Sequence, residues 1–335
     1  MVAPQRRHSK ANSVLCYNTS EVETTIEHQH LEARGSKLER LKIWFLETRP
    51  QFLTLSIVLA FLGSTVAWYD GYDFNLWHAM LAGIGLMLAH ASVNILNDYF
   101  DFQSGIDSAT RRTPFSGGSG ILPAGLLSPR QVLWLGIVMF VLAIPIGIYF
   151  VIIKGWQLMP LLIVATSFIV LYSPFILKHP WPEWAAGTGL GALPILGMYF
   201  AQTGAYTSTA AVACIPSAFL VHNLLLLNEF PDVEADMLAK RKTVPISIGR
   251  DKAAIFYSVV AIAVYVWIIG WVAAREMPVW TLLALLTLPI TIRAINGARH
   301  HEDASILMPG MAANVMTVLL TQLFTGIGYI LGRVF

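Results

Sequence analysis

Apolar residues follow one another along this chain in long blocks, without the alternation of a half-buried strand or the one-sided stripe of a soluble helix. A bilayer core of about 30 Å takes about 20 apolar helical residues to cross, and helices and closed barrels alone satisfy the backbone polar groups there. Because the blocks are continuous, we predict an all-α, polytopic membrane protein with nine transmembrane helices. The predicted spans are 52–69, 76–96, 132–153, 156–176, 184–200, 210–227, 253–274, 279–295 and 308–331.

The composition of the chain fits a membrane protein. Hydrophobic residues make up 56% of the 335 residues and charged residues 13%, against about 25% charged residues in an ordinary globular protein. Arg293 is the one charged residue inside the nine predicted spans. These values exclude a soluble globular protein, a disordered chain and a nucleic-acid binder, and membrane lipid is the expected surrounding of the chain.

The N-terminal region differs from the rest. Its first 40 residues carry charges of both signs and no apolar stretch like that of a secretory signal peptide. We expect 1–35 to be a mobile polar tail and 36–335 to be the nine-helix transmembrane domain. Residues 36–44 fit a short helix on the bilayer surface, with Leu38, Leu41 and Trp44 facing inward. A polar linker fits them equally well.

Basic residues are distributed unevenly between the two sides of the predicted membrane domain. With nine spans, all but three of the 22 basic residues fall on the side that holds the N-terminus, and Lys154, Arg275 and Arg333 fall on the other. Lys and Arg are enriched in cytoplasmic loops. We therefore predict a cytoplasmic N-terminus, a C-terminus on the opposite side, and an inner or plasma membrane location if the chain is bacterial.

Two acidic segments at span ends carry the most informative pattern. Residues 97–101 read N-D-Y-F-D at the end of span two, and 228–232 read N-E-F-P-D at the end of span six. Both ends lie on the predicted cytoplasmic side. An isolated Asp at a span end is commonly a solvated cap. A duplicated cluster on one membrane face is different, because its carboxylates repel one another unless cations are present.

The spacing within these segments points to a divalent cation. Asn97 and Asp101 are four residues apart, as are Asn228, Asp232 and Asp236, and residues at this spacing share one face of a helix. Two opposed faces would form an all-oxygen site for Mg²⁺, which takes oxygen ligands and bridges to substrate phosphates. Pro231 interrupts the second segment, so we expect Asp232 and Asp236 on a new turn that begins there.

Basic residues follow both acidic segments. With Mg²⁺ they could hold and neutralise a departing diphosphate, although their positions also satisfy the topology rule alone. The run 116–120, S-G-G-S-G, could offer backbone N–H groups to a phosphate, but it fits no P-loop and is equally consistent with a flexible loop. The basic residues are Arg111, Arg112, Lys240, Arg241 and Lys242.

Over about 45–335 the sequence resembles the UbiA-type intramembrane prenyltransferases, which have nine transmembrane helices and the cytoplasmic motifs N-D-x-x-D-x-x-x-D and D-x-x-x-D. One departure is that position 105 is Gly where the first motif has its third acid, and Asp107 lies two residues further on. The form D-F-x-x-G-x-D, with A-D-x-x-x-K-R-K-T at 235–243, resembles the 1,4-dihydroxy-2-naphthoate polyprenyltransferase branch of menaquinone biosynthesis. Lys240 stands where that branch usually has Gly.

The resemblance implies roles for particular residues. Asp101, Asp232 and Tyr172 would be catalytic, with Tyr172 facing an allylic cation through its aromatic ring, although a lone Tyr at a span end is often an interface anchor. Asp98 matches the motif but is expected to face away from the site, in a supporting role. The implied diphosphate ligands are Arg111, Arg112, Lys178, Arg241 and Lys242. The implied Mg²⁺ ligands are Asn97, Asp98, Asp101, Asp107, Asn228, Asp232 and Asp236.

The expected reaction is Mg²⁺-dependent transfer of a polyprenyl group from its diphosphate to an aromatic acceptor, in a central cavity open to the cytoplasmic side. The acceptor favoured by the resemblance is 1,4-dihydroxy-2-naphthoate. The alternatives are 4-hydroxybenzoate, homogentisate, a porphyrin-type ring or a glycerol phosphate. A cation-coupled transporter is the main alternative of another class, but transporter sites usually lie near the midplane. A non-catalytic scaffold would need no acidic clusters, and the sequence gives no oligomeric state.

Overall fold

The computed structural model describes residues 37–106, 113 and 115–335, and all regular structure in that part of the chain is helical. The expected all-α fold is therefore confirmed. The helices are α2 (Lys37–Glu47), α3 (Pro50–Tyr69), α4 (Leu76–Ser104), α5 (Pro129–Lys154), η2 (Trp156–Leu158), α6 (Met159–Leu171), η3 (Ile176–Lys178), α7 (Glu183–Ala186), η4 (Gly187–Ala192), α8 (Leu193–Thr203), α9 (Ser208–Asn228), α10 (Val233–Leu238), α11 (Val244–Ile248), α12 (Arg250–Ala273), η5 (Val279–Thr287), α13 (Leu288–Arg299) and α14 (Ala304–Val334).

The chain divides into two compact units, 1–44 and 45–335. The described part of the first unit is helical and contains most of α2, so the short helix expected at 36–44 is present. Its position on a bilayer stays a prediction. The expected tail, 1–35, lies outside the described residues. All further description concerns the unit 45–335.

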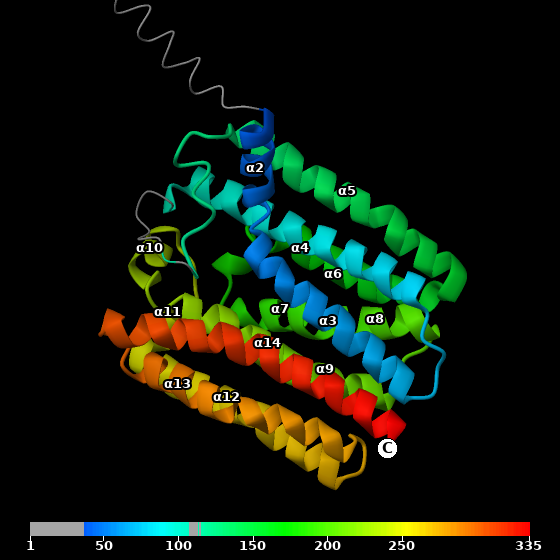
Figure 1. Ribbon diagram of the computed structural model, residues 1–335. Coiled ribbons are helices and arrows are strands. Elements are labelled where there is room, and N and C mark those ends of the chain that lie inside the picture. Colours follow the sequence, from blue (N-terminus) through cyan, green and yellow to red (C-terminus); the bar gives the residue numbers. More distant parts are fainter. Residues whose placement is uncertain (1–36, 107–112, 114) are drawn as a thin grey trace, which may run out of the picture. The chain divides into compact units, whose positions relative to one another are not determined.

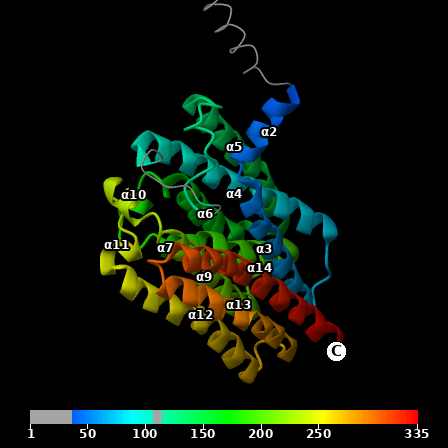
Figure 2. The ribbon, with the colours of Figure 1, turned by 60° about the vertical axis from the view of Figure 1, so that its left-hand side comes forward.

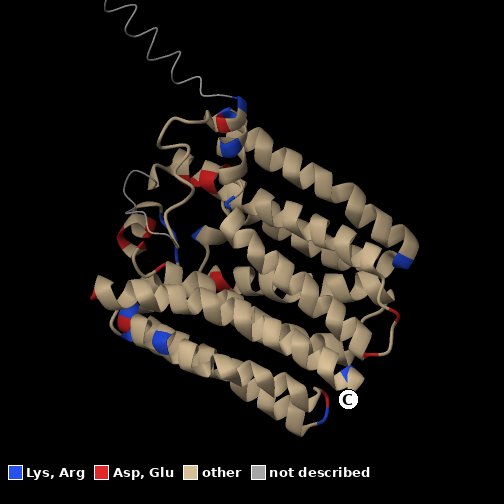
Figure 3. Cartoon of the chain, in the orientation of Figure 1, with Lys and Arg blue, Asp and Glu red and all other residues tan. Residues whose placement is uncertain are grey.

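Eight helical stretches among the described residues are long and apolar enough to cross a membrane. They overlap eight of the predicted spans, and charged residues lie mostly at the helix ends and in the loops between helices (Figure 3). The remaining predicted span, 156–176, corresponds to a shorter apolar stretch, Trp156–Leu171. Its 16 residues reach about 24 Å, less than the bilayer core, so nine complete spans stay a prediction.

The long helices run side by side around a shared core (Figures 1 and 2). Helix α14 packs against α3, α9, α13 and η5, while α4 packs mainly against α5. Large side chains from different helices meet in the core, among them Leu59, Ile195, Tyr199, Ile268 and Tyr329. The half formed by α12, η5, α13 and α14 therefore shares one continuous packing core with α3, α8 and α9.

Hydrogen bonds between buried side chains also join α12, η5, α13 and α14. The Tyr265 hydroxyl lies within hydrogen-bond distance of Thr287 and Thr291. Thr287 in turn contacts Thr321 at 2.7 Å, and Thr291 contacts Thr317 at 3.2 Å. Such bonds stabilise helix pairs in an apolar medium, because no water is present there to form hydrogen bonds with the hydroxyl groups. They link three neighbouring spans in one chain of hydroxyl groups.

The span Glu183–Thr203 contains a π-helical segment, η4, between α7 and α8. A Cβ built on Gly187 would lie 2.6 Å from the carbonyl oxygen of Ala218, and one on Gly191 would lie 2.6 Å from that of Ser217. Only glycine permits this approach. These two glycines therefore allow α9 to pack closely against the span.

A cavity of about 750 Å³ lies between α3, α4, α5, α6, α8, α9 and α14. Its α4 wall runs along one helix face from Ala82 to Asn97, a length of about 22 Å. Apolar side chains line most of it, and polar side chains gather at one end, where Asn97, Tyr172 and Asn228 all face it. The cavity has the place and the polarity expected from the sequence, and the side of the membrane to which it opens stays a prediction.

Candidate active site

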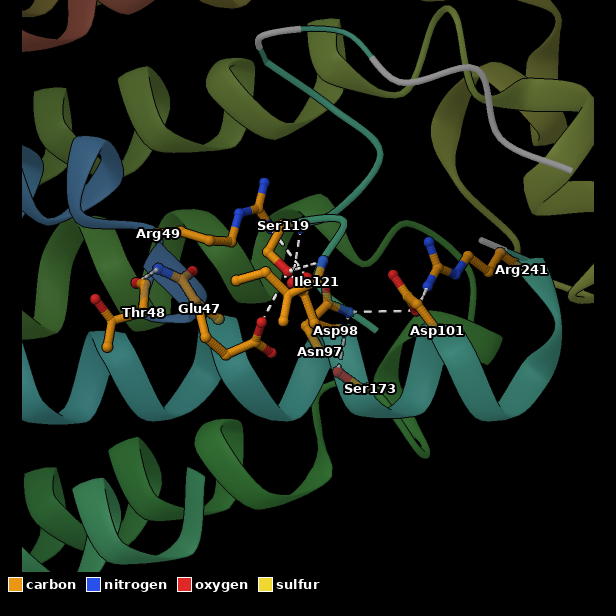
Figure 4. Close-up of polar contacts among 11 residues, drawn as sticks. Glu47, Thr48, Arg49, Asn97, Asp98, Asp101, Ser119, Ile121, Ser173 and Arg241 are labelled. Carbon is orange, nitrogen blue, oxygen red and sulfur yellow. Dashed lines mark hydrogen bonds and ion pairs between the residues drawn. The ribbon is translucent and has the colours of Figure 1, made fainter. Parts of the chain in front are cut away.

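The first acidic segment forms the last turns of α4, which ends at Ser104 and is followed by Gly105 with φ 77°. Asn97 and Asp101 share a helix face, as their spacing predicts, and the Asn97 Nδ2 group lies 3.5 Å from Asp101 Oδ1. The same amide donates to Ser173 Oγ at 3.1 Å. Ser173 therefore ties the first segment to the chain that follows α6 (Figure 4).

The second acidic segment begins where α9 ends, at Asn228. Pro231 interrupts the helix, and α10 starts at Val233 with Asp232 as its N-terminal cap position. The new turn thus begins two residues after the proline. The Asp236 N–H donates to the Asp232 carbonyl at 2.8 Å, so Asp232 and Asp236 lie on successive turns. Asp236 is buried, and Asp232 is half-buried.

The two segments meet at Arg241. Its guanidinium contacts Asp101 at the end of α4 (Figure 4). It also donates to Asp236 Oδ1 at 2.9 Å. The Asp101 and Arg241 side chains are 14% and 15% exposed, and that of Asp236 is 3% exposed. One planar cation can bind two carboxylates in this way because its N–H groups point in fixed directions. Segments 140 residues apart in the sequence are therefore joined at one point.

Burial changes the acidity of the second segment. Burial first, and then the nearby Asp236 charge, raise the pKa of Asp232 from 3.8 to about 7. The pKa of Asp236 is also raised by burial, against the opposing effect of Arg241. Burial, followed by the Glu183 charge, raises the pKa of Glu229 well above its ordinary value. A further positive charge close to these carboxyl groups would lower their pKa values again.

The residues at this junction suit Mg²⁺ by their chemistry. The Asn228 Oδ1 atom is buried and has no hydrogen-bond partner among the described residues, and Asp101, Asp232 and Asp236 add carboxylate oxygens. No three Asp, Glu, His or Cys side chains in the described part of the chain are grouped as a ready-made metal site. Mg²⁺ does not require such a group, since it is commonly held by one or two carboxylates together with waters and substrate phosphates.

Asp98 points away from this junction. One of its oxygens accepts the Ser119 N–H at 2.7 Å, and the other lies 3.6 Å from Arg49 Nη1. Its side chain is 3% exposed. The structure thus separates Asp98 from Asn97 and Asp101, although all three belong to one motif.

The predicted diphosphate residues Lys178 and Lys242 belong to two paired loops. The Lys242 N–H donates to the Leu177 carbonyl at 3.3 Å, and the Trp181 N–H donates to the Lys242 carbonyl at 2.9 Å. Both lysine side chains are exposed. The pairing brings these two lysines into the same region as Arg241. Asp107, Arg111 and Arg112 lie outside the described residues.

The backbone explains the departure at Lys240. Its φ is 58°, in the left-handed region that glycine adopts without steric cost. Lys240 closes α10 and turns the chain so that the Arg241 N–H donates to the Asp236 carbonyl at 3.0 Å. Glycine suits position 240 because the backbone there has a positive φ, and Lys240 adopts the same φ in this protein.

Two residues shape the site although the sequence predicted no role for their side chains. Glu183 is fully buried and accepts the Val244 N–H at 2.6 Å, which fixes the loop that carries Arg241. Ser116 Oγ lies 3.5 Å from Asp232 Oδ1. Glu183 stands at the start of a span and Ser116 in a glycine-rich run. No sequence motif indicates that their side chains contact the loop after α10 or Asp232.

Comparison with known proteins decides the family. A model of the UbiA prenyltransferase family matches residues 56–320. The chain belongs to this family. As a member of the UbiA family, it is a membrane-embedded prenyltransferase, and the resemblance seen in the two acidic segments is confirmed.

Individual UbiA relatives cover most of the chain. It is 27% identical to a 1,4-dihydroxy-2-naphthoate octaprenyltransferase of Bacillus subtilis over 86% of this chain and 92% of that protein. It is 31% identical to a digeranylgeranylglyceryl phosphate synthase of Thermococcus kodakarensis over 63% of this chain and 70% of that protein.

Solved UbiA structures share the fold. A UbiA homologue from Aeropyrum pernix in its apo form aligns with a TM-score of 0.63 and 17% identity, covering 84% of this chain and 98% of that one. A homologue from Archaeoglobus fulgidus, bound to DMAPP and Mg²⁺, aligns with a TM-score of 0.51 and 16% identity, covering 87% and 96%. At these identities the likeness shows the fold alone.

Proposed function

We propose that this protein transfers a polyprenyl group from its allylic diphosphate to 1,4-dihydroxy-2-naphthoate, with Mg²⁺, at the junction of its two acidic segments. The observation that carries the proposal is the Arg241 bridge between Asp101 and Asp236, beside the polar end of a long apolar cavity. An apolar cavity suits an isoprenoid tail, and the polar end suits its diphosphate. The relative from Bacillus subtilis supports the acceptor.

In this proposal Asn97, Asp101, Asn228, Asp232 and Asp236 would hold Mg²⁺. The bound metal would neutralise charge that develops on the diphosphate as it leaves. The UbiA homologue from Archaeoglobus fulgidus, bound to DMAPP and Mg²⁺, supports the choice of Mg²⁺ as the metal. We leave Asp107 in the ligand set as a sequence prediction.

The remaining polar residues act on the substrates. Arg241, Lys178 and Lys242 hold the diphosphate, together with Arg111 and Arg112 if the sequence prediction for those two is right. A fixed positive charge is most effective in a site from which water is excluded. Tyr172 faces the cavity at its polar end, where an aromatic ring can stabilise an allylic cation. The ring of 1,4-dihydroxy-2-naphthoate attacks the cation, and the bond from the ring to its carboxylate then breaks with loss of CO2, which restores the aromatic ring.

We place this site on the cytoplasmic side of the membrane, with the N-terminus on the same side. The distribution of Lys and Arg between the predicted loops supports this orientation. The diphosphate and the acceptor would then reach the polar end of the cavity from the cytoplasm, while the tail stays in apolar surroundings.

A second acceptor class is supported by the relative from Thermococcus kodakarensis, which is named as a synthase of a glyceryl phosphate. A panel of acceptors distinguishes the two classes. Purified protein is incubated with Mg²⁺, one polyprenyl diphosphate, and either 1,4-dihydroxy-2-naphthoate, 4-hydroxybenzoate, homogentisate or a glycerol phosphate, and product masses are measured. A prenylated naphthoate product supports the proposal, and a product from another acceptor alone contradicts it.

The proposed active site is tested by Asp101→Ala and Asp232→Ala. Each should lower the prenyl transfer rate by at least about 100-fold, because each removes a carboxylate from the site that stabilises the departing charge. Asp251→Ala is the control, since Asp251 is an exposed carboxylate outside the site. All three variants should insert into membranes at wild-type levels. Near-normal turnover by both active-site variants would refute the assignment.

A further inference from the structure

The glycine-rich segment 115–120 has a defined path beside the site. Gly117, Gly118 and Gly120 have φ values of 87°, 74° and 85°. Side chains with a Cβ rarely adopt this left-handed region, and glycine does so at no steric cost. The glycines therefore set a particular backbone shape.

One end of the segment reaches the second acidic segment. Ser116 Oγ lies 3.5 Å from Asp232 Oδ1 and 2.9 Å from Thr113 Oγ1. Phe115 faces the cavity and packs against the core around Leu226 and Phe230. This end touches both the proposed metal site and the space proposed for the substrate.

The other end is fixed to the first acidic segment. The Ser119 N–H donates to Asp98 Oδ2 at 2.7 Å, and Ser119 Oγ donates to Glu47 Oε2 at 2.8 Å. The second Asp98 oxygen faces Arg49 at 3.6 Å (Figure 4). A hydrogen bond from a backbone N–H to a buried carboxylate is among the stronger ones in proteins. Ser119 is thus held from two helices, α2 and α4.

We propose that Asp98 is a positioning residue that fixes segment 115–120 across the active site, so that Phe115 and Ser116 lie correctly against the substrate and Asp232. This inference rests on the proposed function. It gives the acid at the second position of the first motif a role distinct from that of Asn97 and Asp101. Its carboxylate acts through the segment and does not bind the metal.

Two substitutions at Asp98 separate positioning from metal binding. Asp98→Asn keeps an oxygen that accepts the Ser119 N–H, whereas Asp98→Ala removes it. A metal ligand would be impaired by both changes, since an amide binds Mg²⁺ more weakly than a carboxylate. A positioning residue should be rescued largely by Asn.

The readouts are hydrogen exchange of the amides of 115–121, Mg²⁺ affinity by calorimetry, and KM for a polyprenyl diphosphate. In Asp98→Ala we expect exchange to be about tenfold faster, as for loss of one strong hydrogen bond. We expect KM to rise about tenfold or more and Mg²⁺ affinity to stay near the wild-type value. Asp98→Asn should stay within about threefold of wild type in all three.

Ser119→Ala is the independent variant. It removes the hydroxyl that binds Glu47 but keeps the N–H that binds Asp98, so exchange and KM should rise less than in Asp98→Ala, again with Mg²⁺ affinity unchanged. Ser119→Ala also tests the inference if Asp98→Ala does not fold. Unchanged exchange in both Asp98→Ala and Ser119→Ala would overturn the inference. So would a loss of Mg²⁺ affinity in Asp98→Asn.

Failure of this inference is distinguishable from failure of the proposed function. Exchange and calorimetry need no turnover and report on the segment and the metal directly. If wild-type protein transfers no prenyl group to any acceptor, the proposed function fails. If the wild type is active but Asp98→Ala leaves segment 115–121 protected, the inference alone fails.

Discussion

At the scale of single residues, burial gives the carboxylates of the second acidic segment their chemical character. Asp232 is half-buried and Asp236 is buried, and both have raised pKa values. The positive charge of Arg241 offsets part of the repulsion between the Asp232 and Asp236 carboxylates. Because the pKa of Asp232 is about 7, the charge of the site changes around neutral pH. It also depends on whether a cation is bound.

The raised pKa of Asp232 predicts a pH dependence of Mg²⁺ binding. Below about pH 7 its carboxyl group holds a proton, and Mg²⁺ must displace that proton to bind. The apparent affinity should therefore rise about tenfold per pH unit as the pH approaches 7 from below, and level off above it. Calorimetric titration with Mg²⁺ between pH 6 and 8 measures this.

Asp232→Asn removes the titrating group and should abolish that slope, whereas Asp251→Asn should keep it. An identical pH slope in Asp232→Asn would assign the proton to another group and contradict the prediction.

The residues of the first acidic segment and the shared face of Asn97 and Asp101 could be found from the sequence, but the binding partner of Asp98 could not. The repeated N-x-x-x-D spacing identified Asn97, Asp101 and Asp232, because that spacing alone places side chains on one helix face. Asp98 has the same residue type in the same motif. Its direction depends on Ser119, 21 residues away, and no local pattern encodes such a contact.

At the scale of elements, α4 and α10 are joined through a loop residue. Arg241 follows α10 and contacts the last turns of α4. The loop is held in turn by Glu183, through the Val244 N–H. Both acidic segments thus depend on a buried acid that fixes the neighbouring loop, Asp98 for the first and Glu183 for the second.

Replacement of Arg241 should separate these elements. Arg241→Gln should lower kcat/KM by about 100-fold, because the junction loses the charge that binds two carboxylates and the diphosphate. Arg241→Lys should recover little, since a single ammonium cannot reproduce the two-sided contact. Steady-state kinetics with a polyprenyl diphosphate measures both. Lys252→Gln, at an exposed lysine outside the site, controls for the lost charge, and equal activity of Arg241→Gln and Lys252→Gln would contradict the prediction.

The positions of the helices followed largely from the sequence. Long apolar runs predicted the spans, since a chain in lipid must satisfy its own backbone. The π-helical segment in Glu183–Thr203 and the shortness of Trp156–Leu171 were not foreseen. Both depend on how a helix packs against its neighbours, and hydropathy does not report packing.

At the scale of the whole membrane domain, the cavity sets how much of a substrate tail can be enclosed. Its apolar end is lined by Ala82, Phe150, Leu158 and Ala201, which also belong to or pack on one buried cluster. The cavity could not be predicted in detail, because its walls come from seven helices and its depth depends on their packing.

Ala82→Phe should shorten the longest tail that the enzyme accepts. The larger side chain fills the apolar end of the cavity, so long polyprenyl diphosphates should lose activity about tenfold or more while a short one keeps most of it. Rates measured over a series of chain lengths show this. Ile84→Phe, on the exposed side of the same helix, should leave the series unchanged. Equal activity of Ala82→Phe across all lengths would contradict the prediction.

The hydroxyl chain through Tyr265, Thr287 and Thr321 has a mechanical consequence. Sliding α12, α13 or α14 past one another would break several bonds that lipid cannot replace, so this half should move as a rigid block. Among the described spans, Leu76–Ser104 and Pro129–Lys154 are the least buried. A substrate that enters and leaves from the bilayer should therefore displace α4, α5 and α6, while the opposite half acts as the fixed frame against which they move.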